Sequence, residues 1–279
     1  MEIEKASAMG FCFGVRRAIE LAQKAVSERG SLQTIGPLVH NRQVVDRLAM
    51  CGVGVAASLD DVQCDTVVIA SHGASPHVID QVRASGLNVI DATCPFVRKA
   101  QIVAQKLGKA GFWVLVFGDV EHPEVRGVLG WAGDNASASL EVPSLNVLPQ
   151  RLGILCQTTQ SQELFTEFAR SIVHNRLAKF AEIRIFNTIC DATRKHQAAA
   201  VDLARRVDLL FVIGSQESAN TQRLVNICAK TGVATYHIET AAGIDRERLS
   251  GHHQIGITAG TSTPDDVIDE VVSLLQAIG

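Results

Sequence analysis

Three cysteines in this sequence share a context, because each is followed four and five positions later by a pair of basic residues. They are Cys12, Cys94 and Cys190, in the segments Gly10-Phe-Cys-Phe-Gly-Val-Arg-Arg17, Asp91-Ala-Thr-Cys-Pro-Phe-Val-Arg-Lys99 and Thr188-Ile-Cys-Asp-Ala-Thr-Arg-Lys195. Each cysteine precedes a helical pattern, and the partial positive charge at a helix N-terminus favours the thiolate, which is the form that binds metals. The pattern predicts three thiolates that are delivered to one place.

The number of these cysteines limits the kind of metal site. Structural zinc closes its tetrahedron with four ligands, and no fourth cysteine or CxxC pair accompanies the three. An iron–sulfur cubane normally takes four cysteines, so one held by three would leave one iron open to a substrate. The alternative interpretation is three buried, unreactive cysteines. The basic pairs are either solvated helix faces or a docking surface for an acidic electron carrier.

The composition is that of an ordinary globular protein, with 279 residues, 47% apolar and 20% charged residues and a formal net charge of −3. This balance provides no basic surface for nucleic acid. The apolar runs are too short to cross a bilayer, and residues 1–5 lack the pattern of a signal peptide. We therefore expect a cytoplasmic protein without membrane association. The odd total of seven cysteines argues against a disulfide framework.

Short apolar runs alternate with longer helical patterns along the whole chain, which favours βα units and mainly parallel sheets. The grouping repeats with each cysteine–helix segment. We predict an α/β fold of three similar lobes, at residues 1–96, 97–193 and 194–279, in which the N-terminal strand is free to pack centrally.

Polar residues follow six of the predicted strands, and ligands of parallel α/β sheets bind outside the carboxyl ends of strands. These ends supply imidazoles, hydroxyls and an amide, a mixture that suits phosphate, with few Arg or Lys residues. The residues are His40, His72, His122, Thr158, Ser218, Asn220 and Ser262. Any one of them alone would more often be a cap or a satisfied polar group, but together they predict an anion site.

Glu124 is the acidic residue best placed for proton transfer, because it follows a predicted strand in the segment His122-Pro-Glu124. Burial there would raise the pKa of its carboxyl into the useful range. The alternative is an ordinary surface glutamate.

With these residues assembled, the chain resembles the 4-hydroxy-3-methylbut-2-enyl diphosphate reductases over nearly its whole length. The motifs that carry the resemblance, in order, are GFCFGVRRAI, VHNRQVVDRL, SHG, DATCPFV, HPEVRG, QTT, NTICDAT, SxxSxNTxRL and GITAGTSTP.

The resemblance implies a pseudo-three-fold trefoil of α/β lobes around a central 4Fe-4S cluster, one per chain, with Cys12, Cys94 and Cys190 as its three ligands. It implies that the substrate's diphosphate is held by His40, His72, His122, Ser218, Asn220 and Ser262. Thr158 would lie near the allylic hydroxyl, and Glu124 would be the proton donor.

The resemblance also implies the chemistry, which is the final step of the methylerythritol phosphate pathway to isoprenoids. The allylic hydroxyl of (E)-4-hydroxy-3-methylbut-2-enyl diphosphate would bind the open iron, and two electrons would enter from a carrier such as ferredoxin or flavodoxin. Glu124, helped by Thr158 and His122, would protonate the departing hydroxyl. The products would be isopentenyl and dimethylallyl diphosphates.

Two features depart from the family pattern. The family usually has two adjacent serines before the asparagine, whereas this chain has Ser218-Ala219, so one hydroxyl toward the diphosphate is missing. The chain also ends soon after Ser262, without the longer tail of some members.

Two other classes of protein remain as alternatives. A redox-neutral iron–sulfur dehydratase or synthase of the quinolinate synthase type would consume no net electrons. An iron–sulfur sensor or phospholigand-binding module would keep its function when Glu124 is replaced by Gln.

Overall fold

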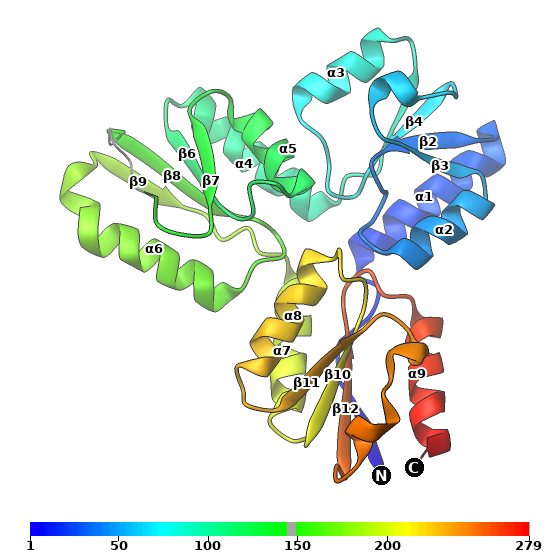
Figure 1. Ribbon diagram of the computed structural model, residues 1–279. Coiled ribbons are helices and arrows are strands. Elements are labelled where there is room, and N and C mark those ends of the chain that lie inside the picture. The colour runs from blue at the N-terminus through cyan, green and yellow to red at the C-terminus, as the bar shows by residue number, and fades with distance from the viewer. Residues whose placement is uncertain (144–148, 279) are drawn as a thin grey trace. The chain divides into compact units, whose positions relative to one another are not determined.

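The computed structural model describes residues 1–143 and 149–278. Within them lie three sheets, each of four parallel strands with helices packed against them (Figure 1). The strand orders are β3-β2-β4-β5, β7-β6-β8-β9 and β11-β10-β12-β1. The α/β class with mainly parallel sheets in three lobes, predicted from the sequence, is therefore confirmed.

The elements follow one another in the same order around each sheet. Around the first sheet they are α1 (Phe13–Arg29), β2 (Leu32–Ile35), α2 (Arg42–Met50), β3 (Val53–Ala56), η1 (Leu59–Asp61), β4 (Thr66–Ile69), α3 (Pro76–Ala84) and β5 (Asn88–Asp91). Around the second they are α4 (Pro95–Lys109), β6 (Trp113–Phe117), α5 (Pro123–Ala132), β7 (Ala136–Ser139), β8 (Arg151–Cys156), α6 (Gln162–Arg176), η2 (Leu177–Lys179) and β9 (Glu182–Ile185). The third set is α7 (Asp191–Ala204), β10 (Leu209–Ile213), α8 (Ala219–Ala229), β11 (Ala234–Ile238), η3 (Ala241–Gly243), η4 (Arg246–Leu249), β12 (Gln254–Ala259) and α9 (Asp265–Ile278), completed by β1 (Glu2–Lys5).

The first strand belongs to the third sheet. Sequence periodicity assigns residues 2–5 to the first lobe, but β1 pairs in parallel with β12, with Glu2 opposite Gln254 and Lys5 opposite Ile257. It takes the edge position that β5 and β9 take in the other sheets. Local periodicity carries no information about a partner so distant in the chain. The lobe boundaries after residues 96 and 193 remain a prediction.

The chain divides into two compact units. One consists of Met1–Arg16, Val39–Arg47 and Asp191–Gly279, and the other of Arg17–Leu38 and Leu48–Cys190. The first unit contains the third sheet, and the second unit contains the other two.

In the unit with the third sheet, alternate side chains of β10 enter two separate cores. Phe211 packs with Ile268 and Leu275 of α9 on one face, and Leu210 packs with Leu203 and Leu224 of α7 and α8 on the other. This two-residue alternation is what a strand covered by helices on both faces requires.

The same construction recurs around the second sheet. Val114 and Val116 of β6 face α4 and α5, while Leu115 and Phe117 face Phe168 of α6. Phe117 and Phe168 have ring centroids 4.8 Å apart. Two apolar layers therefore hold β6 and β8 rigidly, and the polar ends of these strands are fixed with them.

Two exposed ion pairs lie at the start of α9. Arg16 contacts Asp265 at 2.8 Å and Arg47 contacts Asp266 at 2.5 Å, so segments 1–16 and 39–47 are tied to the same unit. Exposed pairs such as these contribute at most about 1 kcal/mol each.

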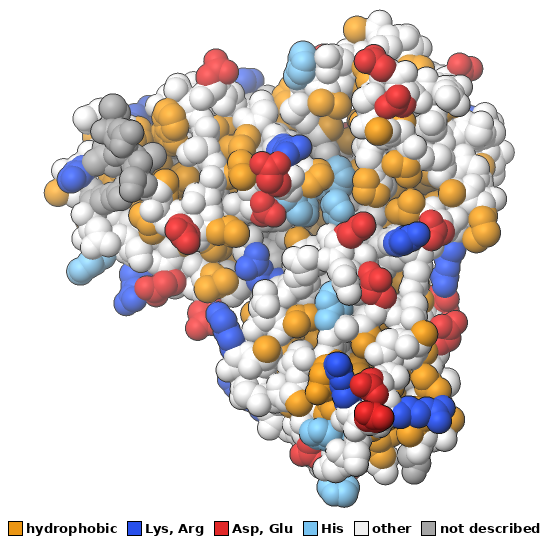
Figure 2. All heavy atoms as spheres, viewed as in Figure 1, with side chains coloured by type: hydrophobic (Ala, Val, Ile, Leu, Met, Phe, Trp, Pro, Cys, Tyr) orange, Lys and Arg blue, Asp and Glu red, His pale blue; other side chains and the backbone are white. Residues whose placement is uncertain are grey.

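On the face drawn in Figure 2, acidic and basic side chains lie interspersed. None of the described helices is both long and apolar enough to cross a membrane.

Gly108 allows α4 and α5 to approach closely. A Cβ atom at this position would lie 1.9 Å from the carbonyl oxygen of Ala132, which is a backbone atom. At Gly127 of α5, by contrast, the nearest atom to an added Cβ is the carbonyl carbon of Ala74 at 3.5 Å, an ordinary contact.

We predict that Gly108→Ala lowers the free energy of unfolding by about 2–3 kcal/mol, because the two helices must move apart. Gly127→Ala is the matched control and should be neutral or stabilising by up to about 1 kcal/mol, because alanine favours the helix. Urea unfolding of both variants measures the difference. Equal effects of the two substitutions would contradict the packing argument.

Candidate functional site

The three cysteines occupy turns that connect an edge strand to a helix. Cys94 lies between β5 and α4, Cys190 between β9 and α7, and Cys12 between β1 and α1. The side chains of all three are of intermediate exposure, unlike those of Cys156 and Cys228, which are buried. Pro95 at the start of α4 has no N–H to leave unsatisfied, so it suits the first helical turn after Cys94.

One backbone hydrogen bond recurs at all three cysteines. The N–H of Cys94 donates to the carbonyl of Ser71 at 2.9 Å, that of Cys190 to Thr158 at 3.0 Å, and that of Cys12 to Thr261 at 3.0 Å. Each acceptor residue lies two positions past the end of the neighbouring strand, which is β4, β8 or β12. The repeated cysteine segment therefore has a repeated structure, in which the turn is hydrogen-bonded to a strand end.

The structure does not by itself assemble a metal site. Among residues 1–143 and 149–278, no group of three or more His, Cys, Asp or Glu side chains is arranged to hold a metal ion. The three cysteines do fit an iron–sulfur cluster by chemistry, because each offers a thiol of intermediate exposure in a turn that leads into a helix. The ligand set Cys12, Cys94 and Cys190 therefore remains a prediction.

Glu124 is buried, with 3% of its surface exposed. One carboxylate oxygen accepts a hydrogen bond from the N–H of Thr158 at 2.7 Å, and the other accepts from the hydroxyl of Thr158 at 2.8 Å. Burial raises the pKa of this carboxyl to about 7, although both hydrogen bonds from Thr158 act in the opposite direction. Near neutral pH the group exists in both protonation states, as a proton donor requires.

Thr158 connects Glu124 to a cysteine turn. Its N–H and hydroxyl hold the carboxylate, and its carbonyl accepts the N–H of Cys190. The threonine is itself 4% exposed, so all three bonds form away from bulk water. The structure thus brings together three of the residues that the sequence singled out.

His122 has a structural role in addition to any contact with a ligand. It is the N-cap of α5, and its Nδ1 accepts a hydrogen bond from the N–H of Glu124 at 3.1 Å. A ring nitrogen that accepts carries no hydrogen, so the neutral ring has its hydrogen on Nε2. The neutral His122 ring is therefore fixed as an Nε2–H donor, two residues before Glu124.

His72 lies in the turn after β4, next to Ser71, which binds the Cys94 turn. Its Nδ1 is 3.0 Å from the carbonyl oxygen of Gly73. His72 also lines a cavity of about 460 Å³ with Arg126, Pro123 and Ser75, at the ends of β2 and β4. The cavity and the His72 turn place an imidazole at the carboxyl edge of the first sheet.

In the other unit, the ends of β10 and β12 and the start of α2 hold the remaining predicted residues. Ser218 is the N-cap of α8, and its hydroxyl accepts the N–H of Thr221 at 3.3 Å. The hydroxyl of Ser262 donates to the carbonyl of His40 at 3.2 Å. Burial lowers the pKa of the His40 imidazole, while Glu217 acts in the opposite direction.

Asn220 is distinguished within this group by the lack of side-chain hydrogen bonds among the described residues. It is 3% exposed, and neither its amide nitrogen nor its carbonyl oxygen has a hydrogen-bond partner among the described residues. A buried amide without partners costs about 1–3 kcal/mol, which binding of an anion at the N-terminus of α8 would recover. The N–H groups of the first turn and the helix dipole favour a phosphate there.

Two features of the candidate site are not predicted by the sequence pattern. The carbonyls of Ser71 and Thr261 fix cysteine turns, and their common position two residues past a strand is visible only once strand ends are known. Gln101 is fully buried on α4 next to the SHG turn, where an added Cβ on Gly73 would lie 2.4 Å from its Nε2. A glutamine at a helical core position carries no signal that distinguishes it from a surface residue.

Parallel α/β sheets, strand ends rich in imidazole and hydroxyl groups, free thiols and a buried carboxyl of raised pKa define a candidate enzyme with an anion site. Comparison with known families agrees with this class. Residues 3–276 match the family described as LytB protein, and the chain belongs to that family.

The relatives carry a consistent name. A protein of Dehalococcoides mccartyi (strain CBDB1) is 47% identical over 281 residues, covering 100% of this chain and 99% of the relative. A protein of Trichlorobacter lovleyi is 42% identical over 280 residues, covering 100% and 99%. Both are named 4-hydroxy-3-methylbut-2-enyl diphosphate reductase, so the family resemblance stated from the motifs is confirmed.

Two solved structures are similar to this chain. One, of (E)-4-hydroxy-3-methyl-but-2-enyl diphosphate reductase, described as the terminal enzyme of the non-mevalonate pathway, is 38% identical with a TM-score of 0.72 and 99% coverage of both chains. The other, the E-1-hydroxy-2-methyl-but-2-enyl-4-diphosphate reductase of Plasmodium falciparum, is 27% identical with a TM-score of 0.92, covering 99% of this chain and 88% of that one.

The raised pKa of Glu124 makes stability depend on pH. The folded protein favours the protonated carboxyl, so this contribution is complete below pH 4.5 and is lost as the pH rises through about 7. We predict that the unfolding free energy of the wild type, relative to Glu124→Gln, falls by about 2 kcal/mol between about pH 5 and pH 8.

Urea unfolding of both proteins across this pH range measures the change. Glu28→Gln serves as a control, because Glu28 is an exposed residue of α1 whose side chain contacts Lys24. A difference between wild type and Glu124→Gln that does not vary with pH would contradict the burial of an ionisable carboxyl.

Proposed function

We propose that this chain is a 4-hydroxy-3-methylbut-2-enyl diphosphate reductase and catalyses the last step of the methylerythritol phosphate pathway. The carbon–oxygen bond of the allylic hydroxyl breaks, the substrate takes up two electrons and two protons, and water leaves. The products are isopentenyl and dimethylallyl diphosphates. Family membership and the names of the relatives support the reaction.

The observation that carries the proposal is the joint position of Glu124, Thr158 and Cys190. A buried carboxyl with a pKa of about 7 is bonded twice by the threonine whose carbonyl fixes the cysteine turn. In the proposed reaction Glu124 donates the proton to the departing hydroxyl. Thr158 holds the carboxylate in one orientation, and burial keeps water from competing for the proton.

The cysteines supply the cofactor site in this proposal. When bound by Cys12, Cys94 and Cys190, a 4Fe-4S cluster, one per chain, would supply electrons one at a time and an open iron as Lewis acid. Electrons come from a carrier such as ferredoxin or flavodoxin. In the predicted trefoil each cysteine turn would be held by a different sheet, because the N–H groups of Cys12, Cys94 and Cys190 bond to the ends of β12, β4 and β8.

The diphosphate is held by the polar strand ends. Asn220 offers an unpartnered amide, Ser218 a hydroxyl, and α8 the N–H groups of its first turn. His40, His72, His122 and Ser262 complete the proposed set. Ala219 occupies the first position of α8, where the family usually has a second serine, and its backbone N–H remains available to the anion.

The proton-donor role predicts a specific loss of turnover. Glu124→Gln should keep the brown colour of the anaerobic protein but lower kcat by about 100-fold or more, which is the usual contribution of a general acid. Oxidation of a reduced viologen and mass spectrometry of the products measure turnover. Substrate conversion without consumption of the reductant would instead identify a redox-neutral dehydratase.

The diphosphate role of Asn220 predicts opposite effects on binding and stability. Asn220→Ala should weaken binding of inorganic diphosphate about tenfold, because a hydrogen bond to a charged group is lost, while the free protein becomes no less stable. Asn41→Ala is the matched control, because the Asn41 side chain accepts the N–H of Val44 at the start of α2. It should destabilise the fold by about 1 kcal/mol. Calorimetric titration and urea unfolding measure both quantities, and unchanged binding in Asn220→Ala would contradict the assignment.

A further inference from the structure

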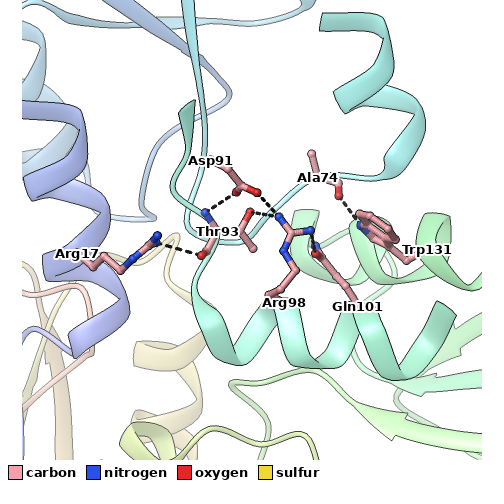
Figure 3. A network of polar contacts seen from close by, with 7 residues as sticks. All are labelled: Arg17, Ala74, Asp91, Thr93, Arg98, Gln101 and Trp131. Atoms are coloured by element: carbon pink, nitrogen blue, oxygen red, sulfur yellow. Dashed lines mark hydrogen bonds and ion pairs between the residues drawn. The ribbon is translucent and has the colours of Figure 1, made fainter. Parts of the chain in front are cut away.

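The basic pairs that follow the cysteines do not have equivalent surroundings. The side chain of Arg98 is 29% exposed, whereas those of Arg16 and Arg194 are each 49% exposed. Arg194 pairs with Asp191 on its own helix, and Arg16 with Asp265. Arg98 is instead drawn into a network of polar contacts at the Cys94 turn (Figure 3).

The guanidinium of Arg98 contacts three side-chain oxygens. It donates to the carboxylate of Asp91, to the carbonyl oxygen of Gln101 at 2.8 Å and to the hydroxyl of Thr93 at 3.4 Å. It also lies 5.5 Å from the centre of the Trp131 ring, within the range of a cation–π interaction. A planar fork with several donors can make these contacts together, and an ammonium group cannot.

These contacts fix the residue directly before Cys94. The N–H of Thr93 donates to the second carboxylate oxygen of Asp91 at 2.9 Å, and its carbonyl accepts from Arg17 at 3.2 Å. Its hydroxyl is held by Arg98. The N–H of Cys94 donates to the carbonyl of Ser71, so the turn is held at the consecutive positions 93 and 94.

The same network reaches the His72 turn. Trp131 of α5 donates its indole N–H to the carbonyl of Ala74 at 2.9 Å, two residues after His72. Gln101 packs against Gly73 on the other side of this turn. Gly130 lets α5 approach, because an added Cβ there would lie 2.4 Å from the Cβ of Ser75.

Helix α5 also carries Glu124 in its first turn. The contacts of Arg98 and Trp131 therefore join three functional positions within one compact unit: the Cys94 turn, the His72 turn and the helix of the proton donor.

We propose that Arg98, stacked on Trp131, is a positioning residue. It holds the Cys94 turn in a fixed position relative to the His72 turn and to helix α5, which carries Glu124. The proposal rests on the proposed function in that it takes Cys94 to be a cluster ligand. It assigns Arg98 an internal role, in place of docking an electron carrier.

The test compares Arg98→Gln with Arg194→Gln, which removes the arginine at the same position after Cys190. In the anaerobically reconstituted full-length protein, Arg98→Gln should release iron to a chelator about tenfold faster, because charge-assisted bonds to the turn are lost. It should also broaden the electron paramagnetic resonance signal of the reduced cluster. Arg98→Lys should recover part of both effects, and Arg194→Gln should resemble the wild type.

A second variant separates the contact of Trp131 with the His72 turn from the contacts of Arg98 with the Cys94 turn. Trp131→Phe keeps a ring beneath Arg98 but removes the N–H that binds Ala74. It should raise KM several-fold, because the His72 turn loosens, while iron release stays at the wild-type rate. Faster iron release without a change in KM would overturn this part of the assignment.

Hydrogen exchange keeps the test independent of the cofactor. In the full-length protein without cluster, the amides of Thr93 and Cys94 should exchange about tenfold faster in Arg98→Gln than in wild type, and those around Cys190 should not change. Wild-type exchange and wild-type iron release in Arg98→Gln would overturn the proposal, as would equal effects of Arg194→Gln. If the wild-type protein binds no cluster, the proposed function fails, and the exchange rates alone decide the role of Arg98.

Discussion

A single backbone hydrogen bond, from the N–H of each cysteine to a carbonyl two residues past a strand end, is the constraint on which the candidate site depends. A turn between an edge strand and a helix lacks the regular backbone hydrogen bonds of a sheet or a helix. Without this bond, only steric contacts would set the position of the turn. The bond transfers the rigidity of the central strands β4, β8 and β12 to Cys94, Cys190 and Cys12. Those strands are buried between two layers of helices or apolar side chains, which is why their ends do not move easily.

Thr158 connects the end of strand β8 to both the Cys190 turn and the carboxylate of Glu124. Its carbonyl accepts the N–H of Cys190, while its own N–H and hydroxyl donate to the carboxylate of Glu124. Two hydrogen bonds to a carboxylate would ordinarily lower the pKa of that carboxyl, yet desolvation of the buried group is the larger effect and the pKa rises to about 7. The threonine therefore fixes orientation, and burial sets the proton affinity.

The sequence indicates candidate chemical residues, but it does not indicate the residues that hold them in position. Cysteine segments and polar strand ends are local patterns, and the α/β alternation follows from local periodicity. The pairing of β1 with β12 and the contacts of Arg98 depend on segments far apart in the chain, or on a side-chain conformation chosen by packing. Arg98 and Arg194 share the position four residues after a cysteine, and each pairs with an aspartate. The Trp131 ring contacts Arg98, whose side chain is 29% exposed, against 49% for Arg194.

The edge position of β1 has a consequence for how the protein is made. Its partner strand β12 is synthesised after all the other described strands, so β1 and the segment that leads to Cys12 have no pairing partner until then. The other two cysteine turns can form as soon as β4 and β8 are in place. A translation product that ends before β12 would therefore lack the carbonyl of Thr261 that holds the Cys12 turn.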